Sequence, residues 1–187
     1  MLLIVPEIRL DSSPNHFPFW AGILAAIVES KGGEVGILDL NALRIKYDGT
    51  QVPPNVIAKE ISSEKWDIIG IGGLTTTYAR IKQLAPLIRK FAPDSLFVGG
   101  GGWSSYNPTE ILELVPELDL IVIGEGEETF AELYDKVNGN SKDFESVNGL
   151  CIRDQNTQYK FTAPRALIAD LNSVPYPAYD LMDTEIY

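Results

Sequence analysis

The stretch LDLIVIGEGEET (residues 118–129) decides the fold, because an apolar run typical of a buried strand passes directly into a glycine-rich turn. An amphipathic helix is predicted to follow, beginning near Thr129. Two glycines at such a junction allow the backbone to bend sharply or to approach another group closely. The helix dipole favours the glutamates beside them, but three carboxylates would not normally surround a phosphate. The turn is therefore predicted to meet a ligand or partner that is not simply a phosphate.

The composition is that of an ordinary globular protein, with 45% hydrophobic and 22% charged residues among 187. A net charge of -11 argues against nucleic-acid binding, because no basic stripe is present to neutralise phosphates. No apolar run is long enough to predict a membrane span. The apolar start, Met1–Val5, lacks a preceding basic segment and is predicted to be a first strand rather than a signal peptide. These features predict a cytoplasmic location.

Apolar runs alternate with helical patterns over the first 140 residues, which predicts a doubly wound, five-stranded parallel sheet of the flavodoxin-like or Rossmann-like kind. The expected strand order is 2-1-3-4-5, with right-handed crossovers. Pro86 lies inside one helical pattern and is expected to kink or split that helix. The predicted strands are Leu2–Val5, Glu34–Asp39, Asp67–Ile71, Ser95–Val98 and Asp119–Ile123, and the predicted helices are Pro18–Lys31, Pro53–Ser63, Tyr78–Phe91, Pro108–Val115 and Glu127–Val137.

The pattern changes after residue 140. Residues 149–153 and 158–162 flank the polar stretch 154–157, which predicts a β-hairpin appended to the sheet or packed on its edge. The proline-containing end of the chain is predicted to be an extended tail, and its apolar and aromatic residues are expected to pack on something. We therefore expect an α/β domain at 1–140, a hairpin at 141–163 and a tail or linker at 164–187.

The candidate binding residues follow from where ligands bind in open parallel sheets, which is the carboxyl edge of the strands. Three of the four loops at that edge are rich in glycine, and together they would form a broad surface with few bulky side chains. A dinucleotide fingerprint, a P-loop lysine and a phospho-acceptor aspartate are all missing from these loops. The candidates are Glu7, Ser12 and His16 in the first loop; Gly72, Gly73, Leu74, Thr75, Thr76 and Thr77; Gly99, Gly100, Gly101, Gly102 and Trp103; and Gly124, Glu125, Gly126 and Glu127.

In this ordered set of segments the chain resembles the N-terminal cobalamin (B12)-binding domain of cobalamin-dependent radical S-adenosylmethionine (SAM) proteins. The resemblance covers nearly the whole chain, and it is carried by Pro18–Ala26, Gly32–Val35, Leu38-Asp39, Trp66–Ile71, Val98–Gly101, Gly124–Thr129 and Asp170–Ala178. It implies a corrin ring over the carboxyl edge of the sheet. The nucleotide tail of the cofactor would pass towards the loops at 75–77 and 99–102.

The resemblance also shows what this chain lacks. Family members with a histidine lower ligand carry Asp-x-His-x-x-Gly in the first loop, whereas here Asp11 is too far from His16 and no glycine follows at the right distance. His16, the only histidine, is a candidate lower ligand of cobalt, or else a loop residue near a helix start. The family's radical domain needs three cysteines for its 4Fe-4S cluster, but this chain has only Cys151, which is expected to be structural. We therefore expect an isolated domain of a longer protein, the alternative being a stand-alone carrier.

Two functions from different classes follow. In the first, this chain holds the corrinoid for a C-terminal radical SAM domain of the same polypeptide, a methyltransferase or cyclase that itself binds S-adenosylmethionine and the cluster. In the second, it is a cobalamin-free interaction scaffold for such a domain, with Trp20, Tyr78, Trp103 and Tyr106 as an aromatic partner surface. A nucleotide or nucleotide-sugar enzyme would rest on fold alone. No residue of this chain is predicted to be catalytic.

Overall fold

The computed structural model describes residues 1–153 and 158–187, and within them the strands form one seven-stranded sheet in the order β2-β1-β3-β4-β5-β6-β7. β1 to β5 pair in parallel and follow the expected order 2-1-3-4-5. β6 pairs antiparallel with β5 and β7 with β6, so the expected hairpin extends the sheet, while its predicted turn at 154–157 lies outside the described residues. The strands are β1 (Leu2–Val5), β2 (Gly36–Asp39), β3 (Ile68–Gly72), β4 (Leu96–Gly100), β5 (Leu120–Val122), β6 (Leu150–Arg153) and β7 (Tyr159–Phe161).

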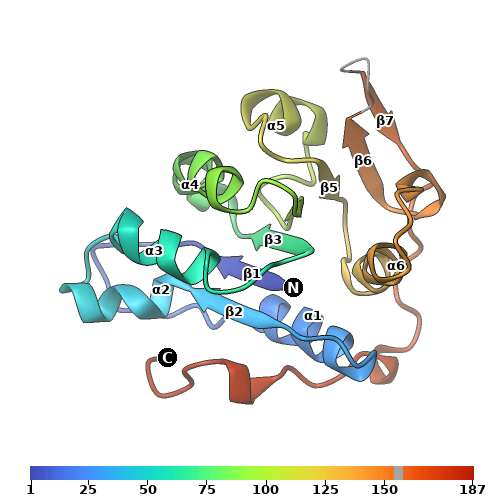
Figure 1. Ribbon diagram of the computed structural model, residues 1–187. Helices are drawn as coiled ribbons and strands as arrows, with labels where there is room; N and C mark the ends of the chain where they lie inside the picture. Colours follow the sequence, from blue (N-terminus) through green and yellow to red (C-terminus); the bar gives the residue numbers. More distant parts are fainter. Residues whose placement is uncertain (154–157) are drawn as a thin grey trace.

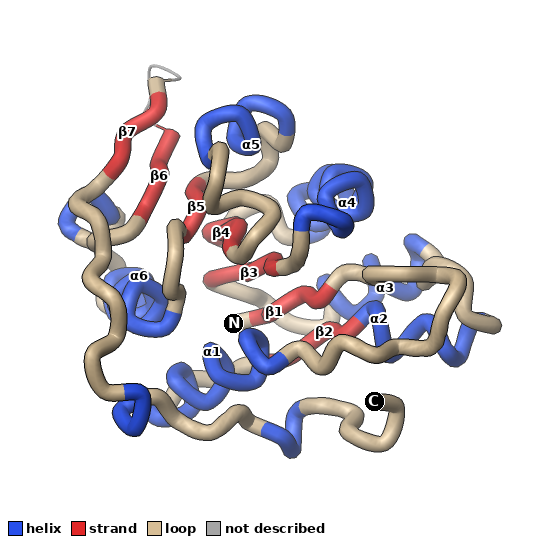
Figure 2. The backbone as a smooth tube through the Cα atoms, turned by 180° about the vertical axis from the view of Figure 1, so that it is seen from behind, coloured by secondary structure: helices blue, strands red, loops and turns tan. Residues whose placement is uncertain are grey.

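Helices cover both faces of the sheet (Figures 1 and 2). α1 and α6 pack on one face, where they contact each other, and α3, α4 and α5 pack on the other. The α-helices are α1 (Phe19–Ser30), α2 (Leu40–Leu43), α3 (Pro54–Ile61), α4 (Tyr78–Phe91), α5 (Pro108–Leu114) and α6 (Glu127–Asn138), and the 3-10 turns are η1 (Arg44–Tyr47), η2 (Thr75–Thr77), η3 (Phe144–Ser146), η4 (Leu171–Ser173) and η5 (Tyr179–Leu181).

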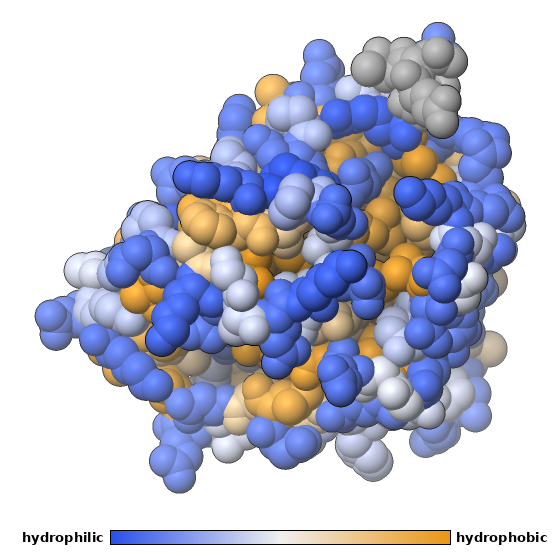
Figure 3. All heavy atoms as spheres, in the orientation of Figure 1, coloured by the Kyte–Doolittle hydropathy of each residue, from blue (hydrophilic) through white to orange (hydrophobic). Residues whose placement is uncertain are grey.

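The core lies on both sides of the parallel strands, as their continuous apolar sequences predict. Leu3 belongs to the cluster under α1 and α6, whereas its neighbour Ile4 belongs to the cluster under α3, α4 and α5, and neither is exposed. Burying a side chain of this size stabilises the fold by about 1.5–3 kcal/mol. Side chains alternate in β4 as well: Phe97 belongs to the cluster under α3, α4 and α5, and Val98 belongs to the cluster under α1 and α6. Hydrophilic side chains cover most of the face seen in Figure 3, with apolar ones visible between them.

Two local features differ from the sequence analysis. The short helix α2 was not predicted, because four residues show no periodicity; Asp39 caps it, its Oδ1 accepting a hydrogen bond from the amide of Ala42 at 3.0 Å. The expected split at Pro86 is wrong, since α4 is continuous from Tyr78 to Phe91. Proline has no amide N–H, so Pro86 cannot donate a hydrogen bond to the carbonyl of Lys82, four residues earlier. Both residues are exposed, so the missing bond lies on the solvent side of the helix.

The C-terminal tail packs along the outside of α1, which confirms that its apolar residues are not free (Figures 1 and 2). The amide of Ala178 donates to the carbonyl of Gly22 in α1 at 3.0 Å, and Met182 lies directly against that glycine. At the end of the tail the hydroxyl of Tyr187 donates to Asp39 Oδ2 at 2.8 Å. The tail therefore belongs to the folded unit.

Cys151 is buried in β6, and burial raises the pKa of its thiol to about 11. A thiol that resists ionisation is a poor nucleophile and metal ligand, which agrees with the structural role expected for it. Among the residues that the structure describes, no helix combines the length and the apolar character needed to cross a membrane.

Candidate functional site

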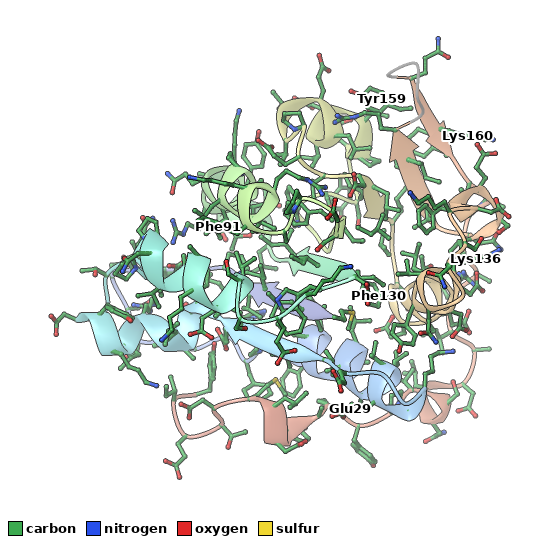
Figure 4. All side chains as sticks on the ribbon, viewed as in Figure 1. Glu29, Phe91, Phe130, Lys136, Tyr159 and Lys160 are labelled. Carbon is green, nitrogen blue, oxygen red and sulfur yellow. The ribbon has the colours of Figure 1, made fainter. Side chains whose placement is uncertain are left out.

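A cavity of about 310 Å³ opens at the carboxyl ends of the parallel strands. This volume is at the lower end of the range for small-ligand pockets. The cavity reaches below the edge of the sheet, between the strands and the helices α1 and α6, where Leu3, Val98 and Phe130 form its walls. Figure 4 labels Phe130, which lies between α6 and the strands. The lining is mostly apolar or glycine, so the cavity favours a ligand part with little charge.

Most of the predicted binding residues line this cavity. Each of the four loops at the carboxyl edge contributes, so residues far apart in sequence meet at one place. The candidates that line it are His16, Gly72, Gly73, Leu74, Thr77, Gly99, Gly100, Gly101, Gly102, Gly124, Glu125, Gly126 and Glu127. His16 is exposed and is the only basic side chain among the described residues of the lining.

The loops after β3 and β4 touch each other through their backbones. Gly101 has φ +95°, and a Cβ atom added there would lie 2.8 Å from the carbonyl oxygen of Gly73. Any other residue would both strain the backbone and force the two loops apart. The loop is closed further by Ser104 and Ser105, whose amides both donate to the carbonyl of Gly101 at 3.2 Å. The contact between Gly101 and Gly73 therefore holds the loops after β3 and β4 together at the base of the cavity.

The turn after β5 leaves open space instead. An added Cβ at Gly124 would meet nothing within 4 Å in the described part of the chain, and one at Gly126 would meet only Val122, at an ordinary distance of 3.7 Å. The Ser105 hydroxyl lies 3.4 Å from the amide of Gly124 and links this turn to the loop after β4. The protein's own packing therefore does not require glycine for space at either position.

The three carboxylates of the turn have different surroundings. Glu125 Oε2 accepts a hydrogen bond from the amide of Ile168 in the tail at 2.8 Å. Glu128 lies 3.5 Å from Arg165 of the tail, which also pairs with Glu132 at 2.8 Å. Glu127 lines the cavity, and its Oε2 is buried without a hydrogen-bond partner among the described residues. Two of the acids thus bind the tail, and the third faces the site.

Five predicted residues do not line the cavity. Glu7 is buried, forms an ion pair with Arg80 at 2.7 Å and accepts the amide of Val52 at 2.9 Å, so its carboxylate joins the loop after β1 to α4. Ser12 is exposed, and its carbonyl accepts from the buried Arg44. The remaining three are Thr75, Thr76 and Trp103.

The threonines are exposed on η2, which leads into α4, and only Thr77 turns inward, donating to the carbonyl of Leu74 at 2.7 Å. Trp103 is 5% exposed and packs in the core on the α4 side of the sheet, its Nε1 donating to the carbonyl of Gly100 at 2.8 Å. The aromatic partner surface expected for a scaffold is therefore wrong. Trp103 is buried, Trp20 and Tyr78 are half-buried, and only Tyr106 of that set is freely exposed, at 94%.

The inner wall of the cavity was missed by the sequence analysis. Trp20 and Phe130 line it from α1 and α6, although Trp20 was considered for a partner surface rather than for the binding site and Phe130 was not singled out. Gly70, an isolated glycine within the apolar run of β3, could have indicated this wall, because a glycine inside a strand often marks a place where another group approaches the backbone closely. An added Cβ there would lie 2.8 Å from Leu3 and 3.7 Å from the ring of Phe130.

Comparison with known proteins agrees with this geometry. Residues 8–134 match the protein family described as B12 binding domain. The chain is 30% identical over 131 residues to the uncharacterized methyltransferase PH0819 of Pyrococcus horikoshii, covering 70% of this chain and 28% of that protein. It is 27% identical over 221 residues to the cytidylyl-2-hydroxyethylphosphonate methyltransferase of Streptomyces wedmorensis, covering 100% of this chain and 41% of that protein. It therefore spans less than half the length of these curated relatives.

Solved structures show the same fold. The cobalamin-dependent S-adenosylmethionine radical enzyme OxsB with aqua-cobalamin bound superposes with a TM-score of 0.77 at 20% identity, over 96% of this chain and 24% of that one. The radical S-adenosylmethionine methyltransferase TsrM from Kitasatospora setae, with cobalamin and an iron–sulfur cluster bound, gives 0.73 at 19% identity, over 94% of this chain and 30% of that one. At these identities the likeness supports the fold alone.

Proposed function

The chain belongs to the family of B12-binding domains, and we propose that it holds cobalamin at the carboxyl edge of its sheet and presents the corrin ring to a radical SAM domain. The observation that carries the placement is the cavity, where the glycine loops after β3, β4 and β5 meet. Its volume of about 310 Å³ suits the nucleotide tail of the cofactor, whereas the ring would lie outside, across the loops.

The residues fit such a ligand in two respects. Gly102 and Gly124 leave open space where a side chain would otherwise project, with nothing within 4 Å of an added Cβ in the described part of the chain. Glu127 offers a buried oxygen that no described residue satisfies. When bound, cobalamin supplies the cobalt centre for methyl transfer or ring closure on an unreactive carbon. The residues of this chain bind it, orient it and exclude water from its tail.

Titration with hydroxocobalamin tests the proposal. We expect the visible spectrum of the cofactor to change on binding, and the colour to stay with the protein through gel filtration and dialysis. Tyr176→Ala serves as a control, because this residue is exposed in the tail and does not line the cavity, so the variant should bind like the wild type. Failure of the wild-type chain to retain the cofactor at tens of micromolar would refute cobalamin binding by this chain.

The radical SAM domain is proposed to follow on the same polypeptide. Support comes from the relatives, of whose length this chain covers 28% and 41%. The parent protein would then act in the cytoplasm as a methyltransferase or cyclase, with S-adenosylmethionine and a 4Fe-4S cluster in that second domain. The reading frame after Tyr187 tests this: three cysteines spaced Cys-x3-Cys-x-x-Cys would support it, and an immediate stop codon would count against it.

A further inference from the structure

Glu127 is the one acid of the 124–129 turn that the tail leaves without a partner. Its Oε2 is buried, and no donor among the described residues reaches it. Glu125 and Glu128, on either side, are bound by the amide of Ile168 and by Arg165. A buried polar oxygen without a hydrogen bond is costly to a fold, so its presence needs an explanation outside the protein's own packing.

The surroundings of Glu127 narrow the chemistry of the missing donor. Val122, Gly126 and Phe130, which line the same cavity and are close to Glu127 in sequence, offer no side-chain donor. Among the described residues of the lining there is no lysine or arginine, and His16 forms no ion pair with Glu127, so no protein cation holds the carboxylate. Glu125 adds a second negative charge to the lining. A phosphate would be repelled at this point. The group that fits is an uncharged donor, such as a hydroxyl or a primary amide.

We propose that Glu127 is the polar recognition residue of the cavity and accepts a hydrogen bond from a hydroxyl or amide group of the bound corrinoid. This inference rests on the proposed function. A corrinoid carries such donors in two places, the ribose of its nucleotide tail and the amide side chains of its ring. A ligand without such a donor would leave this buried oxygen unpaired, so the carboxylate makes binding selective for ligands that supply one.

A role in recognition has a signature that a role in folding lacks. If Oε2 has no partner in the free protein, replacing the carboxylate by an uncharged group of similar length relieves a cost of folding. The free Glu127→Met protein should therefore melt close to the wild type, because relief of that cost opposes the loss of a carboxylate that the dipole of α6 favours. Its affinity for cobalamin should nevertheless fall by about ten-fold to a hundred-fold, the range expected for losing a hydrogen bond to a charged group. Glu127→Gln, which keeps an acceptor oxygen, should lose less.

The experiment measures the Kd of hydroxocobalamin and of a cobinamide, which lacks the nucleotide, for the full chain and for Glu127→Met, Glu127→Gln and Glu128→Gln. The last is the matched control, because Glu128 is exposed and pairs with Arg165. A loss for cobalamin alone places the donor on the nucleotide tail, and an equal loss for both ligands places it on the ring amides; either supports the proposal.

Two results would overturn the inference. One is unchanged affinity of Glu127→Met for both corrinoids while the wild type binds them, and the other is a marked drop in the melting temperature of the free Glu127→Met protein. Failure of the wild-type chain to bind either corrinoid is a different outcome, since it would reject the proposed function first. The Glu128→Gln control separates a local effect at Glu127 from a general effect of removing negative charge from the turn, because a general effect would weaken binding in both variants.

Discussion

Gly126→Val is the sharpest test of where the cofactor lies. Gly126 precedes α6 with φ -95°, a conformation open to a β-branched residue, and an added Cβ would meet only Val122 at 3.7 Å. The protein therefore has room for the Cβ atom, and because Gly126 lines the cavity, a larger side chain there should narrow it. Loss of glycine at a helix N-cap costs about 1 kcal/mol, which would lower the melting temperature by roughly 2–4 °C in a chain of this size.

The effect on binding should be larger than the effect on folding. Forcing extra carbon atoms into an occupied site costs on the order of 1–3 kcal/mol, equivalent to a Kd that is about 5- to 150-fold weaker. The loss of stability does not affect this value, because a domain with several kcal/mol of stability stays folded at 25 °C after losing about 1 kcal/mol. Titration of hydroxocobalamin, followed by absorbance, measures the Kd, and Gly126→Ala should give an intermediate value. If the valine variant binds within about two-fold of the wild type, the ligand does not approach Gly126 and the placement is wrong.

Five further substitutions are expected to have separable effects. Gly124→Ala and Gly32→Ala are matched, with φ +75° and +74° and open space around both; each should destabilise by about 1–2 kcal/mol, but only the former should weaken cobalamin binding. Arg165→Gln should cost about 1 kcal/mol in urea unfolding, and less in high salt, because its glutamate partners are about half exposed. Burial raises the pKa of Asp39, so its contribution to stability falls as pH rises through the folded-state pKa, and Asp39→Asn should gain relative to the wild type between acidic and neutral pH. His16→Ala should leave the visible spectrum of bound cobalamin unchanged, and a shifted spectrum would identify His16 as the lower ligand.

The sequence was sufficient for the strands and for the loops of the site because those signals are local. Continuous apolar runs predict strands buried on both faces, and parallel pairing then brings the ends of those strands to one edge. The four glycines from Gly99 to Gly102 could be assigned to the site for this reason alone. The prediction required no knowledge of side-chain direction.

Side-chain direction is where the sequence analysis failed. Trp103 follows those four glycines, and whether it faces the cavity or the core depends on the turn at Gly101, with φ +95°, which no local pattern reveals. Glu7 was assigned to the site, but its partner Arg80 lies 73 positions further along the chain. Contacts over such separations depend on how the whole sheet assembles, so the residue types near Glu7 could not indicate them.

The turn after β5 serves the cavity and the tail at the same time, and this limits how far the two can act independently. Glu125 lines the cavity and accepts a hydrogen bond from the amide of Ile168, while Arg165 donates to Thr129 in the first turn of α6 and to Glu132 further along that helix. A ligand that shifted the turn would have to strain or break these contacts, and any coupling between ligand and tail would be reciprocal. Its size cannot exceed the contacts involved, about 1.5–3 kcal/mol for the bond from Ile168 to Glu125 and up to about 1 kcal/mol for each partly exposed ion pair. The acids of the turn are thus divided by position: the outer ones fix the chain that leaves the domain, and the inner one faces the site.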